Sequence, residues 1–293
     1  MERGVNVILE KPEWLTIKYN QNDNFLNIKN IIKNNNLHSV CQESHCPNIS
    51  ECWSLGTATF MILGNTCTRN CGFCATKTGK NGCLTDEKEP EKISNAIKEL
   101  KIFDYVVLTS VCRDDLEDYG SGHYAECIKK IKEDNPNLIL ETLIPDFSLD
   151  CLKKIVIKKP DVISHNIETV KRLQIKVRDN RASYKKSLDV LKNIKTLNKS
   201  IYTKSSLMVG LGENEDEVIE AMEDLRENKV DILIIGQYLR PSLKHLEVKE
   251  YISLDKFDFY RRKALEFGFS SVASGPFVRS SYKAGELFLK NDI

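Results

Sequence analysis

The chain has 293 residues, with 43 basic and 42 acidic side chains and a formal net charge of +1. This near-neutral balance lacks the basic excess that binding to nucleic acid or to an anionic membrane requires. Hydrophobic residues make up 41% of the chain, which is enough for a sizeable core, but no stretch approaches the roughly 20 apolar residues that span a bilayer. The length exceeds that of most single domains, yet a β/α barrel reaches it as one domain.

The chain contains ten cysteines. Its first residues, MERGVNVILEKPEW, include acidic side chains and lack the apolar core of a secretory signal. We therefore expect a reducing, cytoplasmic location, with an organelle form whose presequence has been removed as the open alternative. In such a compartment clustered thiols indicate metal binding or catalysis more often than disulfides.

Residues 1–36 are polar, and within them residues 24–36 repeat apolar side chains at the spacing of a short amphipathic helix. Three cysteines follow in a C-x4-C-x5-C pattern: Cys41, Cys46 and Cys52. Free cysteines are often buried in a core, but the neighbours of these three, among them His45 and Asn48, are polar and typical of a loop. We predict a loop that binds a metal centre. His45 is expected at the surface or next to the ligands, with a role as a ligand as the alternative.

A second set of cysteines forms a C-x3-C-x2-C pattern: Cys67, Cys71 and Cys74. It comes shortly after residues 57–63, whose Thr, Phe and Ile content predicts a buried strand. Three thiolates on so short a loop can face one metal centre. A structural zinc ion would need a fourth ligand from elsewhere, whereas an iron–sulfur cubane on three thiolates keeps one iron open for another molecule. The spacing favours the cluster and leaves zinc as the alternative.

From residue 57 onward, strand-like apolar runs alternate with amphipathic helical stretches. The expected strands are 57–63, 105–110, 138–144, 161–167, 204–209 and 231–236. The expected helices are 90–101, 121–133, 148–158, 183–197, 214–228 and 255–267. Repeated strand–helix units predict parallel strands with right-handed crossovers, in an open doubly wound sheet or a partial barrel. Polar residues directly after the strands favour the barrel, because a barrel gathers its strand ends on one face.

Several short motifs are spread over nearly the whole chain: CQESHCPNISEC, GNTCTRNCGFCA, HNIETV, GQYLRPS and the ending ASGPFVRSSY. Together they resemble the lipoyl synthase family of the radical S-adenosylmethionine (SAM) superfamily. The resemblance implies an α/β fold, a partial (β/α)6 barrel of the radical SAM type, over residues 57–238. It also implies an N-terminal extension, residues 1–56, with the first cysteine set, and a C-terminal extension, residues 239–293, with the RSSY motif.

The cofactors that the resemblance implies are two [4Fe–4S] clusters and S-adenosylmethionine. The implied ligands of the first cluster, whose open iron binds S-adenosylmethionine and starts catalysis, are Cys67, Cys71 and Cys74. The implied ligands of the second are Cys41, Cys46, Cys52 and, from the RSSY motif, Ser281. A hydroxyl is a poorer iron ligand than a thiolate. The serine corner is therefore expected to be labile and to take part in catalysis, as a sacrificial sulfur donor requires.

The reaction that the resemblance implies is the insertion of two sulfur atoms at C6 and C8 of an octanoyl group on a carrier-protein lysine. Two unactivated C–H bonds must break, which acid–base catalysis cannot achieve, so the cofactor supplies a radical. The implied partners are octanoylated lipoyl domains of 2-oxoacid dehydrogenase complexes or the glycine cleavage H protein, and an external electron donor. We expect a monomer that binds neither nucleic acid nor a membrane.

Further candidates for contacts with S-adenosylmethionine lie at strand ends: Thr109, Ser110, Asn166, Glu168 and Arg178. Thr109 and Ser110 stand where the family binds the methionine part, with strand-end capping as the open alternative. Asn166 and Glu168 are candidates for the ribose or the amino group. Arg178 is a candidate for the carboxylate, which a guanidinium can bind bidentately, with a solvated helix arginine as the alternative.

One position departs from the family pattern. Where the family has T-S-V-D-R-D-D, this chain places a thiol, Cys112, in place of the first aspartate. A thiol cannot form the charged hydrogen bond of a carboxylate, so any role of this position is in doubt. Among the remaining cysteines, Cys127 and Cys151 lie at helical spacing with apolar residues and are expected in the core, while Cys83 is expected in a polar loop.

A basic stretch follows the fourth expected strand: Lys171, Arg172, Lys176, Arg178 and Arg181. A solvated helix face is the default interpretation, and contact with an acidic lipoyl domain is the alternative. Two other functional classes stay open. The first cysteine set and the RSSY ending argue against a different radical enzyme that shares only the second cysteine loop, and the near-neutral charge argues against a zinc module that binds nucleic acid.

Overall fold

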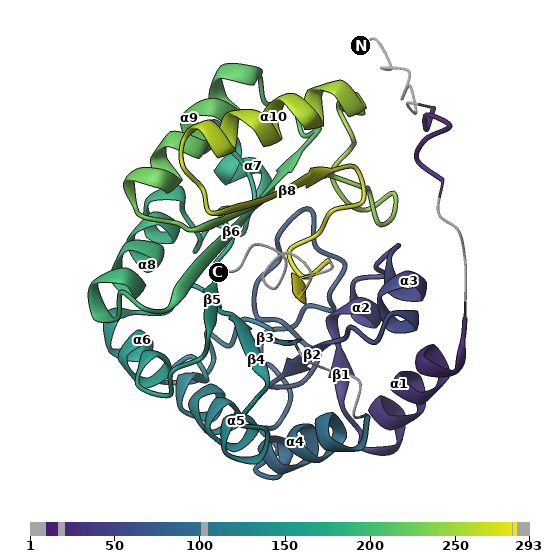
Figure 1. Cartoon of the computed structure of the whole chain (residues 1–293), viewed down its shortest axis with the longest axis vertical. Coiled ribbons are helices and arrows are strands. Elements are labelled where there is room, and N and C mark those ends of the chain that lie inside the picture. Colours follow the sequence, from purple (N-terminus) through teal and green to yellow (C-terminus); the bar gives the residue numbers. More distant parts are fainter. Residues whose placement is uncertain (1–9, 17–20, 101–104, 283, 286–293) are drawn as a thin grey trace.

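The computed structural model describes residues 10–16, 21–100, 105–282 and 284–285. At its centre is a sheet of eight strands in the order β1 to β8. The sheet curves around a central space and carries helices on its outer side (Figure 1). β2 to β8 are parallel, whereas the short β1 pairs antiparallel with β2. With β1 and β8 at its two ends the sheet stays open, and the predicted partial barrel is confirmed.

Six strands of the sheet match the predicted ones to within a few residues. The strands are β1 (His38–Ser39), β2 (Thr59–Ile62), β3 (Tyr105–Ser110), β4 (Ile139–Leu143), β5 (Val162–Ser164), β6 (Tyr202–Val209), β7 (Ile232–Gln237) and β8 (Ser271–Gly275). The prediction missed β1 and β8. These two strands lie in the ranges predicted as the N-terminal and C-terminal extensions, and the divisions near residues 57 and 239 stay predictions.

All seven predicted helices are present. The α-helices are α1 (Asp23–Asn34), α2 (Val40–Glu43), α3 (Ile49–Ser54), α4 (Glu89–Leu100), α5 (Ser121–Asp134), α6 (Leu149–Val156), α7 (Gln174–Val177), α8 (Tyr184–Leu197), α9 (Glu215–Glu227) and α10 (Leu254–Glu266), with a 3-10 turn η1 (Lys171–Leu173). The prediction missed the short elements α2, α3, α7 and η1. None of the described helices is long and apolar enough to cross a bilayer.

The strands are apolar on both faces because each face is covered. Alternate residues point outward, such as Val106 and Leu108 of β3, and pack in the core beneath the helices. The intervening residues point inward, and in β3 they are Tyr105 and Val107, which belong to a separate cluster in the barrel interior. Ala284, near the end of the described chain, is part of that interior cluster. The C-terminal segment therefore returns into the barrel after β8.

A buried ionic network lies inside the barrel around Glu141 of β4. Its carboxylate accepts hydrogen bonds from the Tyr105 hydroxyl at 2.5 Å and from the Ser164 hydroxyl, and it pairs with Lys204 Nζ at 2.7 Å. These side chains come from four adjacent strands, β3 to β6. Burial, followed by the charge of Glu141, raises the pKa of Tyr105 well above its usual value, so its hydroxyl stays a donor. The network joins four inward-facing positions on the same side of the sheet as the apolar interior cluster.

We predict that Lys204→Met lowers the free energy of unfolding by about 3–5 kcal/mol, because it leaves the Glu141 carboxylate buried without its cation. Urea denaturation followed by circular dichroism measures the change. Lys185 is the matched control: its side chain is 84% exposed and pairs with Asp189 four residues on, so Lys185→Met should have little effect. An equal loss of unfolding free energy in the two variants would show that the buried pair stabilises the protein no more than the exposed pair does.

Candidate functional site

The C-x3-C-x2-C loop begins where β2 ends. Leu63 and Gly64 adopt positive φ angles of 66° and 80° and turn the chain out of the strand. Gly64 has no room for a side chain, because a Cβ would lie 2.5 Å from Cβ of Cys83. The loop is then held by its backbone, since Cys67 N donates to Lys77 O at 2.8 Å and Gly72 N donates to Val177 O at 2.9 Å. The second cysteine set therefore stands on a fixed turn next to β2.

Two thiols of this loop receive hydrogen bonds from backbone N–H groups. Arg69 N donates to Cys67 Sγ at 3.4 Å, and Asp179 N donates to Cys71 Sγ at 3.3 Å. Such donors stabilise sulfur that carries negative charge. Burial, with the neighbouring charges of Cys74 and Glu168, raises the pKa of Cys71 to about 12. Burial also raises the pKa of Cys74. Metal binding would therefore have to displace protons from these thiols.

The unusual thiol of Cys112 lies against Cys67. A hydrogen bond between the two thiols lowers the pKa of Cys67 and raises that of Cys112, so negative charge is favoured on Cys67. The backbone of Cys112 is also tied to the loop, because its carbonyl accepts from Thr68 N and from Thr68 Oγ1, each at 3.0 Å. The position that departs from the family pattern thus contacts the cysteine loop directly.

Arg69, between the first two cysteines of the loop, connects it to the barrel. Its side chain is 8% exposed and makes a bidentate contact with Asp114, at 3.0 Å from Nε and 2.9 Å from Nη2. The same guanidinium pairs with Asp146, which follows β4. A buried arginine with two carboxylate partners fixes the direction of the loop that carries it. Sequence reasoning missed this network, because the partners are separated from Arg69 by 45 and 77 positions.

Asp146 is the centre of the charged cluster under the loop. Its carboxylate lies 3.2 Å from Nε2 of His165 and 3.4 Å from Nη2 of Arg178. Burial would raise the pKa of Asp146, but the hydrogen bond with His165 and the charges of Arg178 and Arg69 hold it well below its usual range. Arg178 is 9% exposed, so the alternative of a solvated helix arginine is wrong for this residue. Its side chain also donates to Gln174 and Ser187.

The candidates for cofactor contacts gather at the same ends of the strands. Ser110 Oγ at the end of β3 is buried without a hydrogen-bond partner among the described residues, which points to a group that the protein chain does not supply. Thr109 Oγ1 instead donates to Leu143 O at 3.1 Å, as a strand-end cap would. Asn166 Nδ2 donates to Glu168 Oε1 at 3.0 Å, and Glu168 has a φ of 65°, a strained angle for a residue with a side chain.

The first cysteine set lies in helical structure, which corrects the prediction of a loop. Cys41 belongs to α2 and Cys52 to α3, and both side chains pack against the core beside α1. Cys46 N in the connecting turn donates to Cys41 O at 3.0 Å. Burial, then the nearby Cys41 thiol, raises the pKa of Cys46 to about 11, against the effects of an Asn48 hydrogen bond and the Arg279 charge. The polar neighbours that suggested a loop serve as turn and cap residues between short helices.

The RSSY segment lies against this first cysteine set. Asn48 Nδ2 donates to Phe277 O at 2.6 Å, and the Tyr282 hydroxyl donates to Glu51 Oε2 at 3.0 Å. A turn closes between Arg279 and Tyr282 through a 2.9 Å hydrogen bond from Tyr282 N to Arg279 O, which places the two serines at its corner. The hydroxyl of Ser280 donates to Asn166 Oδ1 at 3.1 Å. The C-terminal segment therefore bridges the first cysteine set and the barrel mouth.

The thiols of the two cysteine sets are spaced more widely than the ligands of one metal ion. Within the part of the chain that the structure describes, a single group of three potential ligands has all its ligand atoms within 4.8 Å of one another, and it contains none of these six cysteines. Ligands of a tetrahedral zinc ion lie only about 3.5 Å apart. A larger inorganic centre, such as an iron–sulfur cluster, suits the wider spacing better.

The basic stretch after β5 does not form one solvated face. Arg178 is buried, Arg172 pairs with Glu217 at 2.5 Å, and Arg181 pairs with Asp179 at 2.8 Å. Arg181 also reaches Asp114 beneath the cysteine loop, at 3.4 Å. Part of the stretch thus supports the loop, which the sequence alone did not predict.

The chain matches the radical SAM superfamily over residues 61–225. It is 50% identical over 284 residues to the apicoplast lipoyl synthase of Plasmodium falciparum, covering 96% of this chain and 68% of that protein. It is also 50% identical to the lipoyl synthase of Methanocella arvoryzae, covering 95% of each. Among solved structures, methylornithine synthase has a TM-score of 0.55 at 17% identity over 72% of this chain and 62% of that one, a likeness of fold alone.

We predict that Asp146→Asn destabilises the protein by about 3–5 kcal/mol at neutral pH, because an amide cannot balance the buried cations around it. Since the pKa of Asp146 is depressed in the fold, its contribution is complete above the unfolded value of about 4 and is lost as the pH falls below it. Thermal unfolding from pH 3 to pH 7 should show a constant gap between parent and variant above about pH 4, and a gap that narrows without closing as the pH falls to 3. Asp150→Asn, at an exposed carboxylate of α6, is the control; a constant gap at all pH values would contradict this account.

Proposed function

The chain belongs to the lipoyl synthase family of the radical SAM superfamily, and from this premise we propose which of its residues serve each part of the reaction. The family makes the lipoyl cofactor by radical insertion of two sulfur atoms, at C6 and C8 of an octanoyl group carried on a lipoyl-domain lysine. Lipoyl synthase activity is the function of this chain. This reaction needs one group of residues that holds the radical-generating cluster and a second group that holds the source of sulfur.

The second cysteine set is proposed as the radical-generating site. Cys67, Cys71 and Cys74 would hold a [4Fe–4S] cluster and leave one iron for S-adenosylmethionine. The fit is supported by the backbone donors on Cys67 and Cys71 and by the unpartnered hydroxyl of Ser110 nearby in the fold. When bound, these groups supply the electron and the carbon radical that ordinary side chains cannot.

The cofactor-contacting residues are proposed from the same strand ends. Ser110 offers a free hydroxyl, and the Asn166–Glu168 pair offers an amide and a carboxylate next to the loop. Burial raises the pKa of Glu168, although the Arg178 charge and the Asn166 hydrogen bond oppose it. Arg178 is already committed to Asp146, Gln174 and Ser187. We therefore assign Arg178 to positioning the site through Asp146 and give Thr109 a capping role.

The first cysteine set is proposed as the second cluster site. Cys41, Cys46 and Cys52 would be completed by Ser281, which stands in the turn between Arg279 and Tyr282. The observation that carries this assignment is the pair of hydrogen bonds that join the two segments, from Asn48 to Phe277 and from Tyr282 to Glu51. They connect parts of the chain that are 229 and 231 positions apart. A serine ligand from the tail can leave when the tail moves, without disturbing the three thiols.

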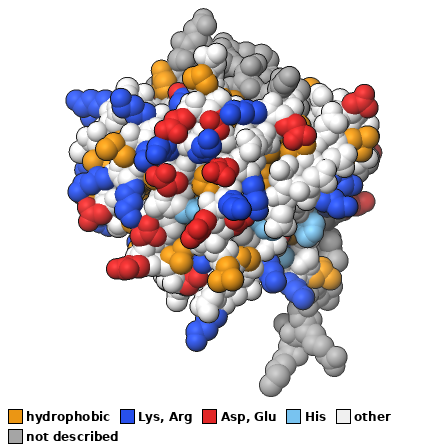
Figure 2. All heavy atoms as spheres, turned by 90° about the horizontal axis from the view of Figure 1, so that it is seen from below, with side chains coloured by type: hydrophobic (Ala, Val, Ile, Leu, Met, Phe, Trp, Pro, Cys, Tyr) orange, Lys and Arg blue, Asp and Glu red, His pale blue; other side chains and the backbone are white. Residues whose placement is uncertain are grey.

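The proposed partners are octanoylated lipoyl domains or the glycine cleavage H protein, together with an external electron donor. The face of the molecule seen from below Figure 1 mixes basic and acidic side chains and shows no large patch of one sign (Figure 2). Recognition of an acidic carrier would then use local contacts, such as the exposed Lys171 and Lys176. Relatives are named as apicoplast and chloroplast proteins, and a cytoplasmic location for this chain, as a monomer, stays a prediction.

We predict that the two cysteine sets have separable roles. Cys71→Ala should abolish reductive cleavage of S-adenosylmethionine, whereas Cys46→Ala should leave cleavage measurable and remove sulfur insertion. Deoxyadenosine and thiolated octanoyl-lysyl peptide are measured by mass spectrometry in the same anaerobic sample. Cys151→Ala, at a cysteine of α6 outside both sets, is the control. Dithiolane formation by Cys46→Ala would rule out the assignment of the sulfur source.

We predict that Ser281→Cys makes the second cluster more stable and less able to give up sulfur, because a thiolate is a stronger iron ligand than a hydroxyl. Iron per chain should be retained longer under chelator, while single-turnover thiolation should fall by at least tenfold. Ser280→Cys is the matched neighbour; its side chain bonds Asn166, so it should not protect the cluster. Parent-like turnover by Ser281→Cys would exclude a labile serine corner.

A further inference from the structure

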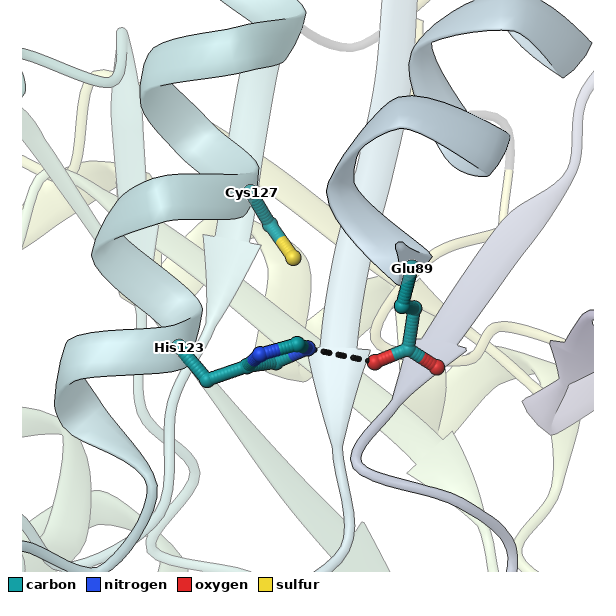
Figure 3. Close-up of side chains that lie close together, drawn as sticks. All are labelled: Glu89, His123 and Cys127. Atoms are coloured by element: carbon teal, nitrogen blue, oxygen red, sulfur yellow. Dashed lines mark hydrogen bonds and ion pairs between the residues drawn. The ribbon is translucent and has the colours of Figure 1, made fainter. Parts of the chain in front are cut away.

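A compact group of potential metal ligands lies outside the barrel mouth, between α4 and α5. Glu89 is the first residue of α4, and His123 and Cys127 are both on α5 (Figure 3). Their ligand atoms all lie within 4.8 Å of one another. His123 Nε2 is 2.7 Å from Glu89 Oε2, and the Cys127 thiol points toward the same space (Figure 3). None of the three belongs to the radical site or to the second cluster site.

We propose that Glu89, His123 and Cys127 bind a zinc ion. The two ligands on α5 are four residues apart, so they project from one face of the helix, as pairs of zinc ligands on a helix do. Sulfur, imidazole nitrogen and carboxylate oxygen are the three ligand types that zinc accepts in proteins. Three protein ligands leave the fourth position of a tetrahedral ion for water.

Charge balance supports a divalent ion in this buried place. Glu89 and Cys127 are nearly inaccessible, and the side chain of His123 is 12% exposed. A carboxylate, a thiolate and a neutral imidazole together cancel the charge of Zn²⁺, so the loaded site is neutral and its burial costs little. Burial, with the charges of Glu89 and Glu126, raises the pKa of the Cys127 thiol well above its usual value. A bound zinc ion would take the place of the proton on that sulfur.

Only small movements are needed to admit the ion. Ligands of tetrahedral zinc lie about 3.3–3.8 Å apart, so the Glu89–His123 contact of 2.7 Å must open by somewhat more than half an ångström. All three ligand atoms lie within 4.8 Å of one another, so the Cys127 thiol has to approach the other two ligands by at most roughly 1–1.5 Å. Side-chain rotation on two neighbouring helices allows both. The partly exposed His123 is the side from which water or the ion can enter.

A zinc ion at this site would stabilise the turn from which the cysteine loop of the radical site starts. Glu89 Oε2 also accepts a hydrogen bond from Leu63 N at 3.0 Å. Leu63 is the residue with a φ of 66° at which the chain leaves β2 for the cysteine loop. A zinc ion on Glu89 would therefore tie α4 and α5 to the turn that sets the start of that loop. In this role the ion needs no contact with substrate.

The test uses the full chain after anaerobic reconstitution with iron and sulfide, so that the six cluster thiols are filled. Zinc is added in excess, unbound metal is removed by gel filtration, and zinc per chain is measured by mass spectrometry. Zinc-edge X-ray absorption then reports the ligands of zinc without interference from iron. The site variants are Cys127→Ser and His123→Gln, and the control is Cys151→Ser, at another buried cysteine, on α6.

The parent and Cys151→Ser should each retain one zinc per chain, with one sulfur neighbour at about 2.3 Å and nitrogen or oxygen neighbours at about 2.0–2.1 Å. Cys127→Ser should lose the sulfur neighbour, and either site variant should bind zinc at least tenfold more weakly. Zinc should raise the unfolding temperature of the parent but of neither site variant. A parent without zinc, zinc with several sulfur neighbours, or equal retention by the site variants would overturn the proposal and leave Glu89 and His123 as a hydrogen-bonded pair that joins two helices.

Discussion

The position of the cysteine loop depends on one buried arginine. Arg69 leaves the loop between two of its cysteines and places its guanidinium between Asp114 and Asp146, which follow β3 and β4. Both carboxylates follow neighbouring strands and bind the same planar guanidinium, so the loop is attached to β3 and β4 as well as to β2. Asp146 extends the connection to His165 and Arg178. The charges are buried together, so the removal of one leaves its partners buried without a counter-charge.

The second constraint is the path of the C-terminal segment. After β8 it contacts the first cysteine set through Phe277 and Tyr282, reaches Asn166 through Ser280, and enters the barrel interior at Ala284. One C-terminal segment thus contacts both the first cysteine set and the mouth of the barrel, through hydrogen bonds and through the packing of Tyr282 against the core. A device that must release a ligand during the reaction is better placed on such a segment than on a strand.

Local patterns in the sequence were sufficient to predict the barrel, but they did not predict the long-range contacts of the site. Apolar runs and helical spacing located β2 to β7 and the larger helices, because each pattern is complete within about ten residues. They failed for β1, which has only two residues, and for β8, whose sequence SVASG has few apolar residues. They also failed for α2 and α3, whose polar turn residues resemble a loop. The cysteine sets were found from spacing, but Arg69, Asp114 and Asp146 were not, because only the folded chain brings them together. The strained φ of Glu168 and the unpartnered Ser110 hydroxyl likewise have no signature in the sequence.

We propose that the first cysteine set, closed by the C-terminal tail, holds the sulfur that enters the product. Reconstituting the full chain with iron and isotopically heavy sulfide, followed by one anaerobic turnover on an octanoyl-lysyl peptide, tests it most directly. Mass spectrometry of the peptide should find two heavy sulfur atoms in the product and no more than one product per chain, whereas Cys46→Ala treated in the same way, with the other cysteine set intact, should form no thiolated product. A dithiolane that carries ordinary sulfur from the medium would contradict the account.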